Sequence, residues 1–411
     1  MKFLTLIIYT IIIKQYLNTI PFDLKNGIKY LGVDDHYNHY HTTYEGPNPV
    51  PNGVAYNSYV IIDEKILIVD GIHEFYQNVW HENLEKALEG RKPDYLLIQH
   101  MEPDHSGNIK HVLKLYPDIK LISSLPSFNM IRNFYGEDFI DKDKKIVIQE
   151  GDEINLGKHI LHFIKAPMLH WPEVVLTYDS YSKTLFSCDV FGKFGANDVD
   201  EPWDDEARRF YFGILGIYGS FAQSFLKKLE KYEIKNIFPG HGATLTDNIN
   251  HYISLYDKWS KYIPDENGVV IVYSTIYGHT KKAVDKLSEK LKSLGIKNVI
   301  HDVTKSHWTQ MIADSFKYNT MILASVMIDN DISPTIKEYI EILTTFKYQN
   351  RKVGFMENGS WNPSATTIMK NMLNECKNLK FLKNVVRIDA SLDENSISQI
   401  NNLASEIYDS N

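Results

Sequence analysis

The short sequence His-Met-Glu-Pro-Asp-His carries four side chains that commonly bind metal ions, namely His100, Glu102, Asp104 and His105. They follow the apolar run Tyr95–Ile98, which is typical of a buried strand. Two carboxylates and two imidazoles would be costly to bury without a cation. The sequence therefore predicts a metal site in the loop beyond this strand, although a single histidine at a strand end is more often a plain surface or core residue.

Three more candidate ligands stand beyond other apolar runs. His170 follows a predicted strand and turn, Asp189 ends the predicted strand Thr184–Cys188, and His241 lies between two glycines after a further run. Proteins with α/β folds assemble active clefts from several strand ends. Seven donors exceed what one tetrahedral zinc ion needs and suit two five- or six-coordinate ions that share a carboxylate. Oxygen and imidazole donors suit iron, whereas Asp189 taken alone could cap a helix.

A second group of polar residues follows the apolar strand Val269–Tyr273 and precedes a predicted helix that begins near Lys281. Hydroxyl groups, backbone N–H groups and a helix N-terminus together make a cradle for a phosphate. No Gly-x-Gly-x-x-Gly occurs, so a mononucleotide fits better than a dinucleotide. A simple helix-capping turn is the alternative. The candidate residues of the cradle are Ser274, Thr275, Ile276, Tyr277, Gly278, His279 and Thr280.

Two further loops are predicted to converge on this cradle, because the carboxyl ends of parallel strands meet at one edge of a sheet. One is the segment 325–330 and the other the segment 357–361. Trp361 could stack on the isoalloxazine ring of a flavin. The candidate cofactor residues of these loops are Ser325, Met327, Asn358, Gly359, Ser360 and Trp361.

The elements that must position these residues fall into two groups. Up to about residue 264, short β-rich runs with mostly antiparallel spacing, and helices at 75–88, 106–116 and 205–231, indicate two sheets packed face to face with helices outside. Ser106 is the predicted N-cap of the second helix. After a polar break at 263–268, five strands alternate with five helices, which predicts a doubly wound parallel sheet. The predicted domains are 25–264 and 268–408, after a hydrophobic extension at 1–24.

Composition excludes several classes of protein. The 411 residues carry a net charge of −8 with Lys and Arg scattered, so nucleic acid is not an expected partner. Two cysteines, Cys188 and Cys376, are too few for an iron–sulfur module of four thiolates. The apolar run Phe3–Ile13 is too short to span a bilayer and lacks a small-x-small cleavage site, which favours an N-terminal extension over a secretion signal. A cytoplasmic protein without a stable membrane span is expected.

The pattern of His-x-Glu-x-Asp-His followed by His170, Asp189 and Gly-His-Gly resembles that of the flavodiiron proteins, also called A-type flavoproteins. The related zinc hydrolases of the metallo-β-lactamase superfamily carry histidine at the position of Glu102, so Glu102 favours iron. The resemblance implies an α/β protein with an αββα metallo-β-lactamase-like sandwich holding two irons and a flavodoxin-like domain holding FMN. It also implies that His100, Glu102 and His170 bind one iron, that Asp104, His105 and His241 bind the other, and that Asp189 bridges them.

The function implied by this resemblance is reduction of dioxygen to water, of nitric oxide to nitrous oxide, or of both. FMN would take electrons from an external donor such as rubredoxin or a reduced deazaflavin and pass them to the two irons. Family members form head-to-tail homodimers, or dimers of dimers, in which the FMN of one subunit serves the irons of its partner. Two alternatives stay open: a zinc-dependent hydrolase fused to a flavodoxin domain, and an electron-transfer protein with a vestigial metal site.

Overall fold

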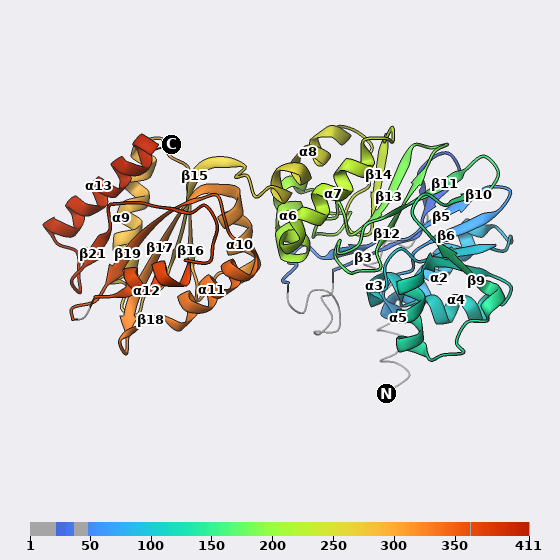
Figure 1. Ribbon diagram of the computed structural model, residues 1–411, viewed down its shortest axis with the longest axis horizontal. Coiled ribbons are helices and arrows are strands. Elements are labelled where there is room, and N and C mark those ends of the chain that lie inside the picture. Colours follow the sequence, from blue (N-terminus) through green and yellow to red (C-terminus); the bar gives the residue numbers. More distant parts are fainter. Residues whose placement is uncertain (1–21, 37–47, 362, 411) are drawn as a thin grey trace, which may run out of the picture. The chain divides into compact units, whose positions relative to one another are not determined.

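The computed structural model describes residues 22–36, 48–361 and 363–410, so most of the predicted extension at 1–24 lies outside the described residues. The chain forms two compact units (Figure 1). The first unit runs up to Tyr211 and adds Ser220–Asp257, and the second comprises Phe212–Gly219 and Lys258–Asn411. The division at Asp257 and the short Phe212–Gly219 segment were not part of the predicted limits, 25–264 and 268–408. Those limits stay a prediction.

The first unit contains two mixed sheets. The strands of one sheet lie in the order β1, β2, β5, β6, β7, β8, β9, antiparallel up to β6 and parallel from there on. Their bounds are Phe22–Asp23, Ile28–Tyr30, Tyr59–Ile62, Ile66–Val69, Tyr95–Leu97, Lys120–Ser124 and Lys145–Ile148. The other sheet follows the order β10 to β14, with bounds Glu153–Asn155, Ile160–Lys165, Val175–Asp179, Thr184–Cys188 and Asn236–Pro239. A small pair, β3 (Val33–Asp35) and β4 (Val54–Tyr56), completes the strands of this unit.

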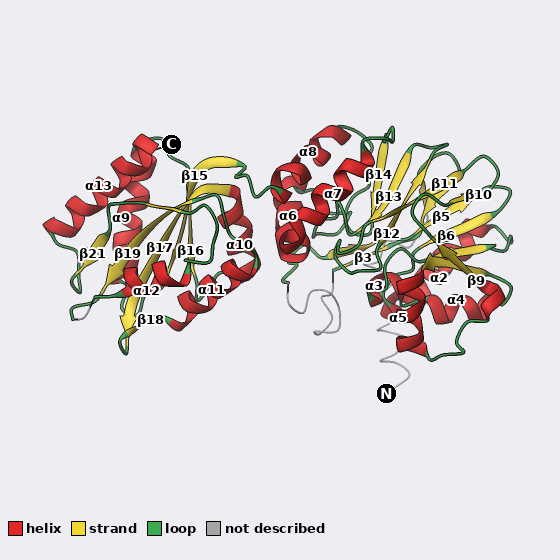
Figure 2. Ribbon diagram, viewed as in Figure 1, coloured by secondary structure: helices red, strands yellow, loops and turns green. Residues whose placement is uncertain are grey.

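Alternation along the strands explains why these sheets form a sandwich. In β6, Ile66 and Ile68 pack in one core with helix residues such as Trp80, whereas Leu67 and Val69 pack in another core with Phe163 and residues of the second sheet. Successive side chains of a strand point to opposite faces, so a strand that is apolar throughout must be covered on both sides. Helices cover the outer faces, as expected for an αββα sandwich (Figure 2). Their bounds are α2 Gln77–Leu88, α3 Pro103–Ser106, α4 Ile109–Leu115, α5 Leu125–Tyr135, α6 Trp203–Phe210, α7 Gly219–Leu229 and α8 Ile249–Ser260.

Three local predictions in this unit differ from the structure. The predicted helix 205–231 is broken into α6, a π-helical turn at Tyr211–Leu215, a 3-10 turn and α7, because Gly213, Gly216 and Gly219 weaken a continuous helix. Ser106 is not an N-cap but the last residue of α3. Its hydroxyl is a donor toward the carbonyls of Met101 and Glu102, which precede that helix. Helices α5 and α8 were not predicted. Within the described residues, no helix is both long and apolar enough to cross a membrane.

The second unit is the predicted doubly wound parallel sheet. Its strands lie in the order β16, β15, β17, β19, β20, with β21 also paired to β19, and the helices alternate with them along the chain. The bounds are β15 Glu266–Tyr273, α9 His279–Ser293, β16 Asn298–Asp302, α10 Trp308–Lys317, β17 Tyr318–Ile328, β18 Asp331–Ile332, α11 Pro334–Thr345, β19 Lys352–Asn358, α12 Ala365–Met372, β20 Lys380–Phe381, β21 Val386–Ile388 and α13 Glu394–Ser410.

One loop of this unit was predicted incorrectly. The segment 325–330 is mostly strand, because β17 continues to Ile328 and returns as β18 through a tight turn. The turn residues Asp329 and Asn330 have φ values of 48° and 62°, which Asp and Asn tolerate better than most residues.

Candidate metal centre and anion cradle

The structure brings all seven predicted metal ligands to one end of the sandwich in the first unit. The cluster 100–105 follows β7, His170 lies between β11 and β12, Asp189 follows β13 directly, and His241 follows β14. Five of the seven residues are at most 4% exposed. Only the side chains of Glu102 and His170 reach solvent, at 21% and 14%. Segments that follow strands of both sheets thus bring polar side chains from distant positions, His100 to His241, into one cluster.

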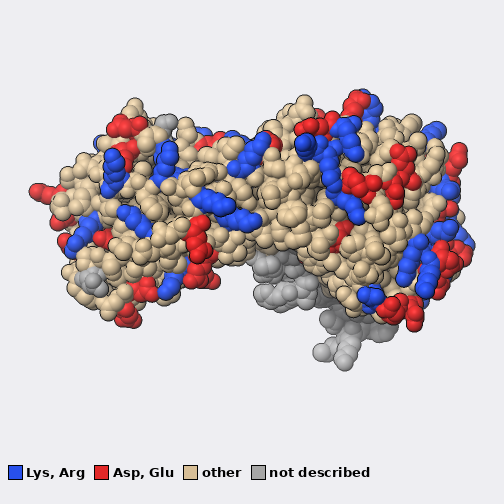
Figure 3. All heavy atoms as spheres, viewed as in Figure 1, with Lys and Arg blue, Asp and Glu red and all other residues tan. Residues whose placement is uncertain are grey.

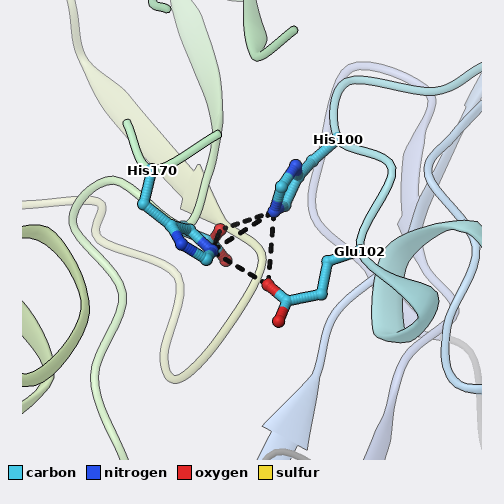
Figure 4. A group of neighbouring side chains, drawn as sticks. His100, Glu102 and His170 are labelled. Carbon is cyan, nitrogen blue, oxygen red and sulfur yellow. Dashed lines mark hydrogen bonds and ion pairs between the residues drawn. The ribbon is translucent and has the colours of Figure 1, made fainter. Parts of the chain in front are cut away.

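The first group within the cluster consists of His100, Glu102 and His170, which point toward one another (Figure 4). Nε2 of His100 lies 3.3 Å from both Oε2 of Glu102 and Nε2 of His170. Nε2 of His170 lies 2.9 Å from the same glutamate oxygen. Three donor atoms therefore face a common point.

The second group consists of Asp104, His105 and His241. Oδ2 of Asp104 lies 3.2 Å from Nε2 of His241 and 3.7 Å from Nε2 of His105. This group is entirely buried, because Asp104 is the most exposed member at 4%. It repeats the composition of the first group, with two imidazoles and one carboxylate.

Asp189 lies between the two groups and offers one oxygen to each. Its Oδ2 is 3.4 Å from Nε2 of both His100 and His170. Its Oδ1 is 3.0 Å from Nε2 of His105 and 3.4 Å from Nε2 of His241. A carboxylate in this position can bridge two ions.

These residues fit a pair of metal ions. Both carboxylate oxygens of Asp104, and Oδ2 of Asp189, are buried and have no hydrogen-bond partner among the described residues. Such atoms favour a ligand, because a buried carboxylate oxygen without a hydrogen bond is costly. Donor atoms held about 2.1 Å from one ion lie roughly 3 Å from one another, which is close to the observed separations. The donor set of imidazole and carboxylate suits iron or zinc.

The charges of the cluster also favour a bound cation. Burial disfavours every charge in it, yet the neighbouring histidines hold the pKa of Asp104 at about 2 and that of Asp189 well below its usual range. Burial would lower the pKa of the histidines, but the carboxylates raise it to about 9 for His170 and about 10 for His241. The carboxylates of the cluster therefore favour positive charge at this position, which a bound metal ion would supply.

Sequence reasoning missed the groups that bind the outer nitrogens of these histidines. Oε1 of Glu173 accepts hydrogen bonds from Nδ1 of His100 at 2.7 Å and from the backbone N–H of Met101 at 2.9 Å. Burial opposes its charge, yet His100 lowers the pKa of Glu173. The carbonyl of Ala55 accepts from Nδ1 of His241 at 2.9 Å. The one available signal for Glu173 was an acidic residue three positions after His170, directly before an apolar strand.

The second unit holds a cavity of about 420 Å³ at the carboxyl edge of its sheet. Of the thirteen predicted cofactor residues, ten line it, together with Val326 and Ala390, which were not predicted. Those ten are Thr275, Ile276, Tyr277, His279, Thr280, Met327, Asn358, Gly359, Ser360 and Trp361. Tyr277 and Trp361 are 86% and 77% exposed, so they form open aromatic walls that a flat ring could cover.

Three predicted residues do not line the cavity. The hydroxyl of Ser325 is already used, since it accepts from the N–H of Ser333 and donates to the carbonyl of Val326. Gly278 has a φ of +83° and precedes α9, and its N–H donates to the Thr275 hydroxyl. The hydroxyl of Ser274 is buried and has no hydrogen-bond partner among the described residues. An unpaired hydroxyl just before the N-terminus of α9 fits a site for a phosphate.

The fold and the two sites define a class of protein, in which a β-lactamase-like metal domain precedes a flavodoxin-like domain. Residues 54–242 match the family described as ODP family beta lactamase. The chain is 29% identical over 369 residues to a nitric oxide reductase from Moorella thermoacetica, and the match covers 87% of this chain and 90% of that protein. It spans only 56% of a putative diflavin flavoprotein from Nostoc, at 27% identity.

Solved structures agree with this classification. The rubredoxin:oxygen oxidoreductase of Desulfovibrio gigas has a TM-score of 0.85 at 22% identity and matches 95% of this chain and 98% of its own. The flavodiiron protein of Giardia intestinalis has a TM-score of 0.86 at 21% identity, over 95% of this chain and 96% of its own. These matches confirm the resemblance to the flavodiiron proteins, and the chain has their two-domain architecture.

Proposed function

We propose that this chain is an oxidoreductase that reduces dioxygen to water, nitric oxide to nitrous oxide, or both, at two iron ions. The observation that carries the proposal is the position of Asp189, whose two oxygens face two equivalent sets of two imidazoles and one carboxylate. His100, Glu102 and His170 would hold one ion, and Asp104, His105 and His241 the other. One FMN in the cavity of the second unit and two irons complete the proposed cofactors.

The chain's own residues determine how a small gas reaches such a centre. Bound iron and flavin would supply the electrons and the point of reduction. The group that contains Asp104 is buried, whereas Glu102 and His170 are partly exposed, so we infer that gas enters past these two side chains. The ring centroid of Trp171 lies 5.0 Å from that of His100 and 6.0 Å from that of His170, so the indole ring narrows this entrance. An apolar wall admits a diatomic gas and disfavours ions.

The proposed partners follow from composition and resemblance. The two cysteines of the 411 residues cannot supply the four thiolates of an iron–sulfur cluster, and we propose rubredoxin or a reduced deazaflavin as the electron donor. A head-to-tail homodimer, or a dimer of dimers, in the cytoplasm belongs to the same proposal. Lys and Arg alternate with Asp and Glu over the face drawn in Figure 3, which gives nucleic acid no basic surface there.

The test is to purify the protein anaerobically, measure iron, zinc and FMN per chain, and follow the consumption of dioxygen and nitric oxide by the chemically reduced protein. We expect two irons and one FMN, and turnover of at least one gas. In Asp104→Asn about one iron should remain, whereas Asp189→Asn should lose most of both, with FMN content unchanged as the control for folding. Two zinc ions with hydrolytic activity and no gas consumption would refute the proposal in favour of a zinc hydrolase.

A further inference from the structure

The two proposed metal sites have the same inner donors but different outer hydrogen bonds. Each set contains two imidazoles, one terminal carboxylate and one oxygen of Asp189. In the first set, Nδ1 of His100 donates to the carboxylate of Glu173 at 2.7 Å. In the second, Nδ1 of His241 donates to the neutral carbonyl of Ala55 at 2.9 Å, and Nδ1 of His105 has no hydrogen-bond partner among the described residues.

The acceptor behind an imidazole affects how strongly that imidazole binds a metal ion. Donation from Nδ1 fixes the tautomer and leaves the Nε2 lone pair directed at the ion, and a carboxylate acceptor makes the ring a stronger donor than a carbonyl does. A ring without an outer acceptor is held less firmly. Because the inner donors match in kind and charge, the two sites differ in their outer acceptors and in the partial exposure of Glu102 and His170.

Glu173 is well held for such a role. The residue is 1% exposed, and the oxygen that accepts from His100 also accepts from the backbone N–H of Met101. The hydroxyl of Ser124, the N-cap of α5, donates a hydrogen bond to the backbone carbonyl of Glu173. One carboxylate oxygen therefore fixes both a ligand ring and the backbone of the loop that carries the other ligands from position 102 to 105.

We propose that Glu173 is a positioning residue that makes the two metal sites unequal. His100, Glu102 and His170 would hold their ion more tightly and at a lower reduction potential than Asp104, His105 and His241 would hold the other. This inference rests on the proposed function, since it requires two redox-active ions in the cluster.

The test compares Glu173→Gln with Asp179→Asn in the iron-loaded full-length protein. Asp179 is a matched control, because it is a buried carboxylate that accepts from Nδ1 of a histidine, His159, at 2.8 Å in the same unit but touches none of the proposed ligands. In Glu173→Gln we expect one iron per chain to be bound ten- to a hundred-fold more weakly in chelator competition, while the other is unchanged. Asp179→Asn should lower thermal stability without changing either iron.

A second readout is the range of potentials over which the half-reduced iron pair accumulates, followed by electron paramagnetic resonance. We expect this range to narrow in Glu173→Gln, and Glu173→Asp, which keeps the charge, to restore part of it. Unchanged iron binding and an unchanged range overturn the inference, as does an equal loss of both irons in all Glu173 variants. A wild-type protein that binds no iron while holding FMN overturns the proposed function itself, which is a distinct result.

Discussion

The buried ionisable residues of the first unit are of two kinds. Those at the metal centre, such as Asp104 and Asp189, retain buried oxygens without hydrogen-bond partners. His159 and Asp179 instead satisfy each other: Nδ1 of His159 binds Asp179, and its Nε2 binds the carbonyl of Asn26. The first pattern is typical of a ligand site and the second of a structural pair, although both use the same residue types.

The His159 pair gives stability a dependence on pH. Burial opposes charge on His159, but Asp179 outweighs it and raises the pKa of the imidazole. A raised pKa in the folded state adds stability that is complete below the unfolded value of about 6.5 and is lost as pH rises through the folded value. We expect His159→Gln to lower the free energy of unfolding by about 2 kcal/mol at pH 6 and by less at pH 9, measured by urea denaturation. An equal loss at both pH values would show that the pair is not charged.

Among individual residues, the sequence predicted which side chains come together, because a side chain must follow a strand to reach the strand-end cluster. His100, Asp189 and His241 could therefore be selected from their settings. Glu173 could not, because a carboxylate that accepts from a ligand ring has no fixed spacing to it: Glu173 lies 73 positions beyond His100 and three beyond His170. Only the fold brings these side chains together.

Elements were predictable where one periodic signal dominated. The strands of the parallel sheet in the second unit are largely buried, and the parallel sheet was predicted from the alternation of strands and helices along the sequence. The prediction of one helix at 205–231 was wrong. Its apolar residues keep a helical spacing throughout, but three glycines within it interrupt the helix. The prediction of a loop at 325–330 was wrong. The hairpin there pairs only two residues of each strand, which is too short to produce a recognisable alternation of apolar and polar residues.

The turn that begins α9 allows a direct test of the anion cradle. Gly278 has a φ of +83° and a Cβ at this position would meet no atom within 4 Å, so Gly278→Ala adds backbone strain of about 1 kcal/mol and no clash. We expect FMN to bind up to about fivefold more weakly, because the bound loop must keep the strained conformation. Fluorescence titration of the apoprotein with FMN measures the change.

Gly295 provides the matched control at the other end of the same helix. Its φ is +74° and a Cβ there would also meet nothing within 4 Å. Gly295→Ala should therefore cost similar stability and leave FMN affinity unchanged. Equal weakening by both substitutions would mean that general destabilisation, rather than the cradle, explains the effect.

At the scale of the whole molecule, the two units are not separable by one cut in the sequence. The segment Phe212–Gly219 interrupts the first unit in the sequence but belongs to the second unit in the structure. The ring of Phe212 stacks on Phe316 with centroids 4.0 Å apart and planes 7° apart, and the Tyr262 hydroxyl donates to the carbonyl of Gly216. No pattern in the sequence indicates that this segment packs in the second unit, because its apolar residues suit either core.

Phe212→Ala tests which unit depends on this segment. The side chain is fully buried, so its truncation should destabilise the second unit by about 3 kcal/mol. Hydrogen–deuterium exchange resolved by peptide should rise in β15 to α13 and stay unchanged around the metal centre. Phe225→Ala, at a residue 2% exposed in α7, should produce the reverse pattern. Faster exchange in both units for either variant would contradict the assignment of each side chain to the core of one unit.

The distribution of the two sites along the chain sets an order for assembly. All seven proposed ligands precede Gly242, whereas the proposed flavin loops run from Ser274 to Trp361. In a polypeptide emerging from the ribosome, all seven proposed metal ligands are therefore synthesised before the proposed flavin loops. The segment Phe212–Gly219 cannot pack against its partner Phe316 until that residue has been synthesised, so its apolar side chains stay unpacked until then.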